Sequence, residues 1–187
     1  MSPRLPHVTA ETADDKQRTL LDDTKRQLGR VPNLYASMAN GPAALKGYLA
    51  MRDALTKGVL TAKLREQLAL LIAQENGCLY CLSAHTMRGG MMGFSDQELA
   101  RTRNAQSGDP HTHAVLTIAR EVMKTGGNVD DAVLTDARSA GVSDAELAEI
   151  VAHIALNVLS NYFNHLAQPE LDFPAVDASL PAIEVTA

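Results

Sequence analysis

The chain has 187 residues, a formal net charge of −5 and a hydrophobic fraction of 45%. This length suits one domain with a core of its own. The 17 lysines and arginines are scattered along the sequence, which argues against nucleic-acid binding, and no apolar run is long enough to cross a membrane. The first eight residues contain two prolines and no apolar segment. We therefore expect no secretory signal, and a cytoplasmic location by default.

Aromatic residues make up only 4% of the chain and tryptophan is absent, so the core must consist of aliphatic side chains, which suit closely packed helices. No segment alternates apolar and polar residues for long enough to indicate a strand. We predict an all-α fold with a single helical domain over residues 1–168. Residues 169–187 contain three prolines and little periodicity, and we predict an extended arm or a frayed tail there.

Glycine, proline and asparagine divide the domain into helical segments. In chain order we predict helices over 9–28, 34–39, 42–57, 62–76, 78–88, from 95 onward, and over 110–125, 129–140 and 144–167. Two of them begin with the same capping-box pattern, in which a serine precedes a glutamate by three residues: Ser95 with Glu98 and Ser143 with Glu146.

The only two cysteines of the chain, Cys78 and Cys81, stand three residues apart. On a helix, Cys78, Cys81 and His85 occupy positions i, i+3 and i+7 and share one stripe. The two sulfurs are then close enough to form a disulfide with little backbone motion. In a reducing compartment such a pair is more often catalytic or metal-binding than structural. The pattern therefore favours thiol redox chemistry, with His85 able to reach Cys81 directly or through a water.

Glu66 belongs to the preceding helix and lies 11 residues before Gly77, while His85 lies 8 residues after it. If the chain folds back at Gly77, these offsets correspond to rises of about 16 and 12 Å, so the two side chains reach a similar height. We expect burial against the neighbouring helix to raise the pKa of Glu66, as a proton-relay group requires near neutral pH.

Different features favour the conversion of each thiol to the reactive thiolate. Cys78 lies at a helix N-terminus, where unpaired amides and the helix dipole stabilise a thiolate. Cys81 lies one turn further along, with His85 as a candidate base. The spacing alone does not decide which thiol attacks first.

The run from Glu66 through Cys78-Leu79-Tyr80-Cys81-Leu82-Ser83-Ala84-His85 resembles the active-site motif of the alkylhydroperoxidase D-like superfamily, which includes the carboxymuconolactone decarboxylase-related proteins. Residues 29–34 and the segment from Pro42 are similar to a peroxidase-related subgroup, and the resemblance extends over about 29–167. It implies an all-helical domain that forms homo-oligomers (a dimer, trimer or hexamer) and reduces hydroperoxides.

The resemblance also implies roles for individual residues. Cys81 would be the peroxidatic thiol and Cys78 the resolving thiol, while Glu66 and His85 would relay the proton. No bound cofactor or metal is implied; an external dithiol protein, lipoyl-bearing or thioredoxin-like, would regenerate the pair. Tyr80, a candidate pocket residue, stands where the best-known members have a histidine. The decarboxylases lack the cysteine pair, which argues against lactone decarboxylation.

Other interpretations remain open. A metal ion would need more ligands than this cluster offers. His153, Asn157 and Asn164 form a polar stripe that could edge the pocket or be satisfied by mutual contacts at a subunit interface. By default we interpret it as a hydrogen-bonded structural row. A lyase could use Glu66 and His85 for acid–base work, and a non-catalytic redox sensor could use the disulfide to change partner binding.

Overall fold

The computed structural model describes residues 3–182, which form nine α-helices and no strand. The helices are α1 (Asp15–Leu28), α2 (Asn33–Met38), α3 (Pro42–Leu55), α4 (Ala62–Glu75), α5 (Leu79–Met91), α6 (Asp96–Arg103), α7 (Pro110–Thr125), α8 (Asp131–Ser139) and α9 (Asp144–Ala167). The predicted all-α fold is confirmed. Among these residues, no helix is both long enough and apolar enough to cross a membrane.

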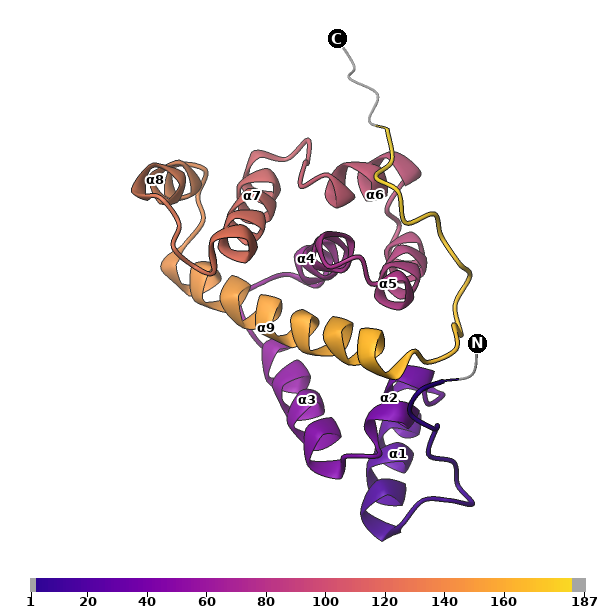
Figure 1. The fold of residues 1–187 in the computed structure, drawn as a ribbon. Helices are drawn as coiled ribbons and strands as arrows, with labels where there is room; N and C mark the ends of the chain where they lie inside the picture. Colours follow the sequence, from indigo (N-terminus) through magenta and orange to yellow (C-terminus); the bar gives the residue numbers. More distant parts are fainter. Residues whose placement is uncertain (1–2, 183–187) are drawn as a thin grey trace.

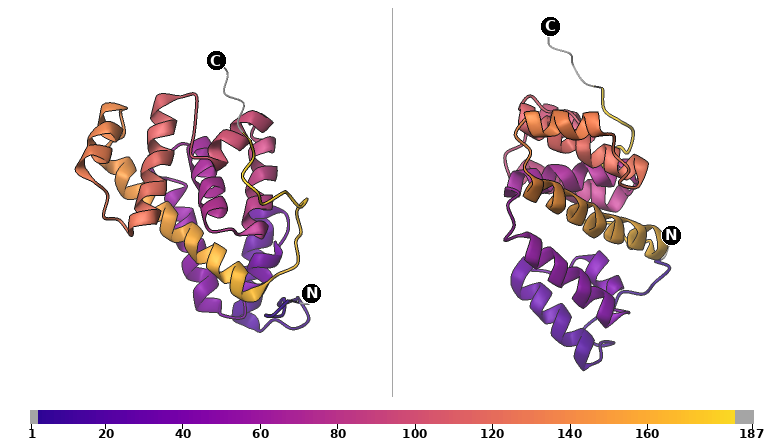
Figure 2. Two further views of the ribbon diagram at one scale, coloured as in Figure 1. Left: turned by 45° about the horizontal axis from the view of Figure 1, so that its top comes forward. Right: turned by 90° about the vertical axis from the view of Figure 1, so that its left-hand side faces the viewer.

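The longest helix, α9, runs diagonally through the molecule (Figure 1). It separates α1–α3 from the other helices, and the turned view shows it between these two groups (Figure 2). α9 packs against α2, α3, α4, α5 and α7. Because so many helices contact α9, one row of its polar side chains is buried in the interior of the protein: His153, Asn157, Ser160, Asn161 and Asn164.

Most predicted boundaries agree with the structure because they depend on local capping. Ser95 and Ser143 both form the expected capping boxes. The start predicted for the first helix was wrong, since α1 begins at Asp15 and not at residue 9. Thr9 and Thr12 instead form a hydrogen-bonded turn, and Asp14 caps the helix by accepting from the Gln17 amide at 2.8 Å.

The fifth helix continues three residues beyond the predicted end at residue 88, and reaches Met91. Gly89 is therefore a helical residue and not a stop signal. A Cβ at this position would lie 2.7 Å from Leu99 Cδ2 and 2.9 Å from Phe94 Cδ2. The glycine is required because the segment leading into α6 packs directly against the α5 backbone.

The reversal between α4 and α5 occurs at Gly77, whose φ of +63° lies in the left-handed region. The two helices pack against each other along their lengths. Apolar residues of α4 face two clusters. One includes Leu70 together with both cysteines, and the other includes Leu68 and Leu71. The cysteine pair thus lies within a packed core and not on the surface.

After α9 the chain runs back along α5 and α6 as an extended segment, residues 169–182, which we call the C-terminal arm (Figure 1). The Asp172 carboxylate accepts hydrogen bonds from the Tyr80 hydroxyl at 2.6 Å and the Asn33 amide at 3.1 Å. It also forms an ion pair with Arg30 at 3.1 Å. Arg103 donates to the Asp177 and Ser179 carbonyls further along. The described part of this segment is therefore a docked arm and not a frayed tail.

We expect Asp172→Asn to loosen the C-terminal arm, because it removes the charge that binds Arg30 and weakens two charge-assisted hydrogen bonds. The loss should be about 1–2 kcal/mol, or roughly tenfold faster amide hydrogen exchange across 169–182, measured by mass spectrometry. Asp177→Asn is the matched control, since the Asp177 carboxylate accepts only from Ser179 of the same arm. Equal exchange in the two variants would contradict this role of Asp172.

Candidate functional site

Cys78 and Cys81 lie at the start of α5, both reduced and both buried. Cys78 is the N-cap residue and Cys81 lies in the first turn. Cys78 is 1% exposed and Cys81 is 3% exposed. The helix start therefore presents two thiols side by side in an apolar environment, beside unpaired backbone amides.

Asn164 of α9 reaches both thiols from the opposite side. Its Nδ2 donates to Cys81 Sγ at 3.1 Å and lies 3.9 Å from Cys78 Sγ. The amide is itself buried. A buried donor at this position stabilises a thiolate on either sulfur, and is most effective for Cys81 because of the shorter distance.

The two thiols titrate as a pair. A hydrogen bond from Cys81 lowers the pKa of Cys78, against the effect of burial. The same hydrogen bond, together with burial, raises the pKa of Cys81 well above its usual value. The first negative charge thus rests on Cys78 while Cys81 keeps its proton, as expected for a cysteine at a helix N-terminus.

Glu66 and His85 meet as the spacing around Gly77 predicts, with Glu66 Oε1 2.7 Å from His85 Nδ1. Arg88, one turn beyond His85 on α5, places Nη2 3.0 Å from Glu66 Oε2. The Glu66 side chain is only 5% exposed. The carboxylate is therefore held between an imidazole and a guanidinium.

The pKa of Glu66 is lowered, so the predicted increase was wrong. Burial does raise the pKa of this carboxyl group, but the charge and hydrogen bond of His85 and the charge of Arg88 together outweigh it. Glu66 is consequently ionised at neutral pH. It accepts the Nδ1 proton of His85 and leaves Nε2 as the nitrogen available for proton transfer.

A cavity of about 820 Å³ lies between two groups of helices, with α1, α2 and α3 on one side and α4, α5 and α9 on the other. Its walls include Cys81, Glu66 and His85, but not Cys78. A small molecule in this cavity can therefore approach Cys81, while Cys78 lies behind it. Among the described residues, no hydrogen bond joins His85 to either thiol. The direct contact considered for His85 and Cys81 is absent, and both side chains meet at the cavity instead.

Tyr80 lies between the two cysteines and forms part of the cavity wall. Its hydroxyl accepts from the Leu34 amide at 3.1 Å and donates to Asp172. Its ring meets Phe173 edge-on, with centroids 5.4 Å apart. Burial and the hydrogen bond to Asp172 raise the pKa of Tyr80 strongly. Tyr80 therefore anchors the C-terminal arm beside the thiols and does not act as an acid.

Sequence reasoning underrated Asn164, which was assigned by default to a structural polar row. The signal was the placement of His153, Asn157 and Asn164 on one face of an otherwise apolar helix. Asn164 contacts the thiols, whereas His153 and Asn157 line the cavity. Which of these residues contacts the thiols depends on how α9 crosses α5, and local spacing does not encode that crossing.

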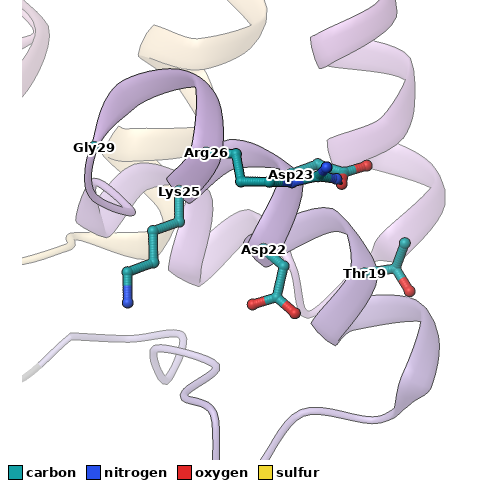
Figure 3. Close-up of a pocket in the computed structure, with 6 residues that line it drawn as sticks. All are labelled: Thr19, Asp22, Asp23, Lys25, Arg26 and Gly29. Carbon is teal, nitrogen blue, oxygen red and sulfur yellow. The ribbon is translucent and has the colours of Figure 1, made fainter.

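Among the described residues, no group of three or more His, Cys, Asp or Glu side chains is arranged to hold a metal ion. A second hollow, of about 660 Å³, lies along α1 (Figure 3). Its walls are Thr19, Asp22, Asp23, Lys25, Arg26 and Gly29. Asp23 and Arg26 pair with each other, and all of these residues except Asp23 are exposed. This hollow contains no cysteine or histidine, and we do not consider it a candidate site.

His153 is buried in the cavity wall, at 4% exposure. Burial and the charge of Arg65 lower its pKa from 6.5 to about 4. Between these two pH values the unfolded chain binds a proton that the folded chain does not, so stability falls as the pH falls through this window.

We expect acidification from pH 6.5 to 4 to remove on the order of 2 kcal/mol through His153, after allowance for solvent in the cavity. His153→Gln should lose this part of the pH dependence, measured by urea unfolding at several pH values. His165→Gln, at an exposed position of the same helix, should keep it. If the His153→Gln and wild-type proteins show the same slope, His153 is not the group responsible.

The comparisons with known proteins agree with this geometry. Residues 42–121 match the family model described as the Carboxymuconolactone decarboxylase family. This segment contains all of α3, α4, α5 and α6, and with them the Glu66–His85 pair and both cysteines. No curated protein matches the chain.

Several solved structures share the fold. An uncharacterized peroxidase-related protein from Ralstonia eutropha JMP134, described as an alkylhydroperoxidase AhpD core, matches with a TM-score of 0.80 and 24% identity, covering 91% of this chain and 92% of that one. A peroxidase-related protein from Silicibacter sp. TM1040 matches with a TM-score of 0.76 and 21% identity, covering 91% and 94%. A cysteine-to-alanine variant of the debrominase Bmp8, in complex with 2,3,4-tribromopyrrole, matches with a TM-score of 0.75 and 16% identity, covering 92% and 93%.

Proposed function

We propose that this protein, which has the alkylhydroperoxidase D-like fold, belongs to the carboxymuconolactone decarboxylase family that residues 42–121 match and is a thiol-dependent peroxidase. The observation that carries the proposal is the arrangement around Cys81. Cys81 and His85 line the same cavity, while a second thiol and the Asn164 amide lie against the Cys81 sulfur. A nucleophile, a resolving thiol and a proton donor are thereby combined at one site.

The first step places the negative charge on the accessible sulfur. The proton of Cys81 passes to Cys78 across the hydrogen bond between the two thiols. The amide of Asn164, 3.1 Å from Cys81 Sγ, stabilises the thiolate formed there. This transfer reconciles the lowered pKa of Cys78 with attack by Cys81.

In the second step, the Cys81 thiolate attacks the distal oxygen of a hydroperoxide. A sulfur–oxygen bond forms, the oxygen–oxygen bond breaks, and the alcohol leaves after taking a proton from His85. Glu66 orients His85 and stabilises its charged form. We assign Glu66 a positioning role, because its lowered pKa makes it a poor proton donor.

In the third step, Cys78 condenses with the sulfenic acid on Cys81, which forms the disulfide and releases water. An external dithiol then reduces the disulfide and is itself oxidised. We propose a lipoyl-bearing or thioredoxin-like protein as this reductant. Because Cys78 is 1% exposed, we further propose that the reductant attacks Cys81, the sulfur that lines the cavity.

We also propose that the protein forms a homo-oligomer through α9. Four apolar side chains of this helix are exposed: Val151, Leu159, Tyr162 and Leu166, at 52%, 46%, 59% and 62%. From residue 151 to residue 166, the helix contains no aspartate, glutamate, lysine or arginine. Such an uncharged apolar row favours a second copy of the chain over water or a charged partner.

We expect Leu159→Glu to reduce the oligomer to a smaller species, because it places a charge in the middle of the apolar row. The mass in solution should be measured by light scattering coupled to size-exclusion chromatography. Val59→Glu is the control, since Val59 is 55% exposed but lies outside α9. A wild-type protein that elutes as a monomer would contradict the proposal.

The proposed function is tested by following hydroperoxide consumption with dihydrolipoamide or with reduced thioredoxin as the electron donor. Turnover that depends on both cysteines supports the peroxidase. A lyase would be favoured by a different activity that His85→Ala abolishes and that the Cys78→Ser, Cys81→Ser double variant retains in full. Oxidation that changes the oligomer size without turnover would favour a redox sensor.

A further inference from the structure

The cavity has a second polar region that the thiol chemistry does not use. Arg65 of α4 and His153 of α9 line it. His153 lies 11 residues before Asn164, the residue that contacts Cys81. At ~1.5 Å per residue this is about 16 Å along the helix axis. His153 therefore lies about three turns of α9 from the residue that contacts the reacting sulfur, but within the same cavity.

His153 has an unused hydrogen-bonding atom there. Its Nε2 is fully buried and has no hydrogen-bond partner among the described residues. A buried nitrogen without a partner is destabilising, and native proteins seldom leave one unsatisfied. Since His153 lines the cavity, a turn of its imidazole ring would bring this nitrogen to a bound molecule.

Arg65 has an unused charge. Arg30, Arg52 and Arg88, which also line the cavity, each form an ion pair with a carboxylate. Within the described part of the chain, Arg65 pairs with no carboxylate. Its guanidinium donates to the Leu60 carbonyl, which leaves further donors free.

A nearby carboxylate does not neutralise Arg65. Glu149, whose charge acts on His153 together with that of Arg65, accepts from the amides of Val59 at 2.8 Å and Leu60 at 3.1 Å. Its two oxygens are held by the backbone. Arg65 is therefore the cation of this cavity that remains available to a ligand.

The cavity wall also includes the mainly apolar side chains of Ala69, Ala84, Tyr48 and Leu156. We propose that the cavity binds amphipathic carboxylates, with the carboxylate on Arg65 and His153 and the apolar body extending toward Cys81. One guanidinium and one neutral imidazole match the single charge of a carboxylate. If the protein is the peroxidase proposed above, its substrates are hydroperoxides that bear a carboxylate. This part of the inference rests on the proposed function.

Binding of octanoate and of octanamide to the reduced full-length protein, measured by calorimetry, tests the site without turnover. We expect octanoate to bind at least tenfold more tightly than octanamide. Arg65→Gln and His153→Leu should remove most of this preference, and Arg65→Lys should retain part of it. Lys63→Gln removes the same charge from the same helix, but outside the cavity, and should have no effect.

Equal binding of the two probes, or no binding of octanoate, would overturn the inference, as would an equal effect of Lys63→Gln. A second measurement compares kcat/KM for a hydroperoxide with a terminal carboxylate and for its methyl ester. We expect the acid to be favoured about tenfold through KM. If octanoate is preferred but no hydroperoxide is consumed, the proposed function fails while the carboxylate site stands. If acid and ester are consumed equally and octanoate is not preferred, the peroxidase stands and the carboxylate site fails.

Discussion

Replacement of Cys81 by serine is expected to lower hydroperoxide consumption by about a thousandfold or more, because among the described residues it removes the only thiol that lines the cavity. Serine preserves the size and the hydrogen bond from Asn164, so the fold should be retained. Stopped-flow measurement of the first turnover, with excess enzyme over peroxide, isolates the attack from the later reduction.

Cys78→Ser is the matched control at the second sulfur. This variant should still react once with peroxide and accumulate a sulfenic acid on Cys81, but should not complete a catalytic cycle with a dithiol. The proton transfer between the thiols is lost with Cys78, so the first step should be slower than in the wild type. If Cys78→Ser abolishes the first reaction and Cys81→Ser retains it, the roles of the two cysteines are reversed.

Glu66→Gln is expected to reduce turnover by about a hundredfold, because a neutral amide no longer orients His85 or stabilises its protonated form. The loss should appear in kcat more than in KM, since Glu66 acts through His85. The substitution also breaks a buried ion pair and should lower stability by on the order of 2–3 kcal/mol at neutral pH. Steady-state kinetics and urea unfolding measure the two effects separately.

The pH dependence of stability gives a further check on Glu66. Its folded pKa is lowered from the ordinary value of 4.5, so its contribution to stability is present above pH 4.5 and is lost as the pH falls through the lower folded value. In Glu66→Gln this contribution should be absent. Glu75→Gln is the control, because Glu75 lies on the same helix and pairs with Arg120 outside the cavity. A folded Glu66→Gln variant with wild-type kcat would contradict the positioning role.

The sequence predicts those parts of the site that depend on local geometry. The residue count around Gly77 places Glu66 level with His85 because both helices are regular and the turn is short. The capping boxes at Ser95 and Ser143 mark helix starts for the same reason. The lowered pKa of Glu66 was not predictable in this way, since it depends on whether burial or the combined effect of His85 and Arg88 is larger, and Arg88 was not recognised as a third partner.

Contacts between distant segments could not be predicted. Asn164 lies 83 residues after Cys81 in the chain, and its function depends on the crossing of α9 over α5. Tyr80 and Asp172 are separated by 92 residues, so the docking of the C-terminal arm beside the thiols has no local signal. The same holds for Arg65 and His153, which belong to different helices and meet only at the cavity.

The most direct test of the central claim is to titrate the reduced protein with a hydroperoxide and to count the thiols lost by alkylation and mass spectrometry. If the cysteine pair reduces the peroxide as proposed, each equivalent of peroxide should consume two thiols, yield one equivalent of alcohol, and link Cys78 to Cys81 within one chain. Peroxide that is consumed without this disulfide, or thiols that remain unchanged in the presence of excess peroxide, would contradict the account.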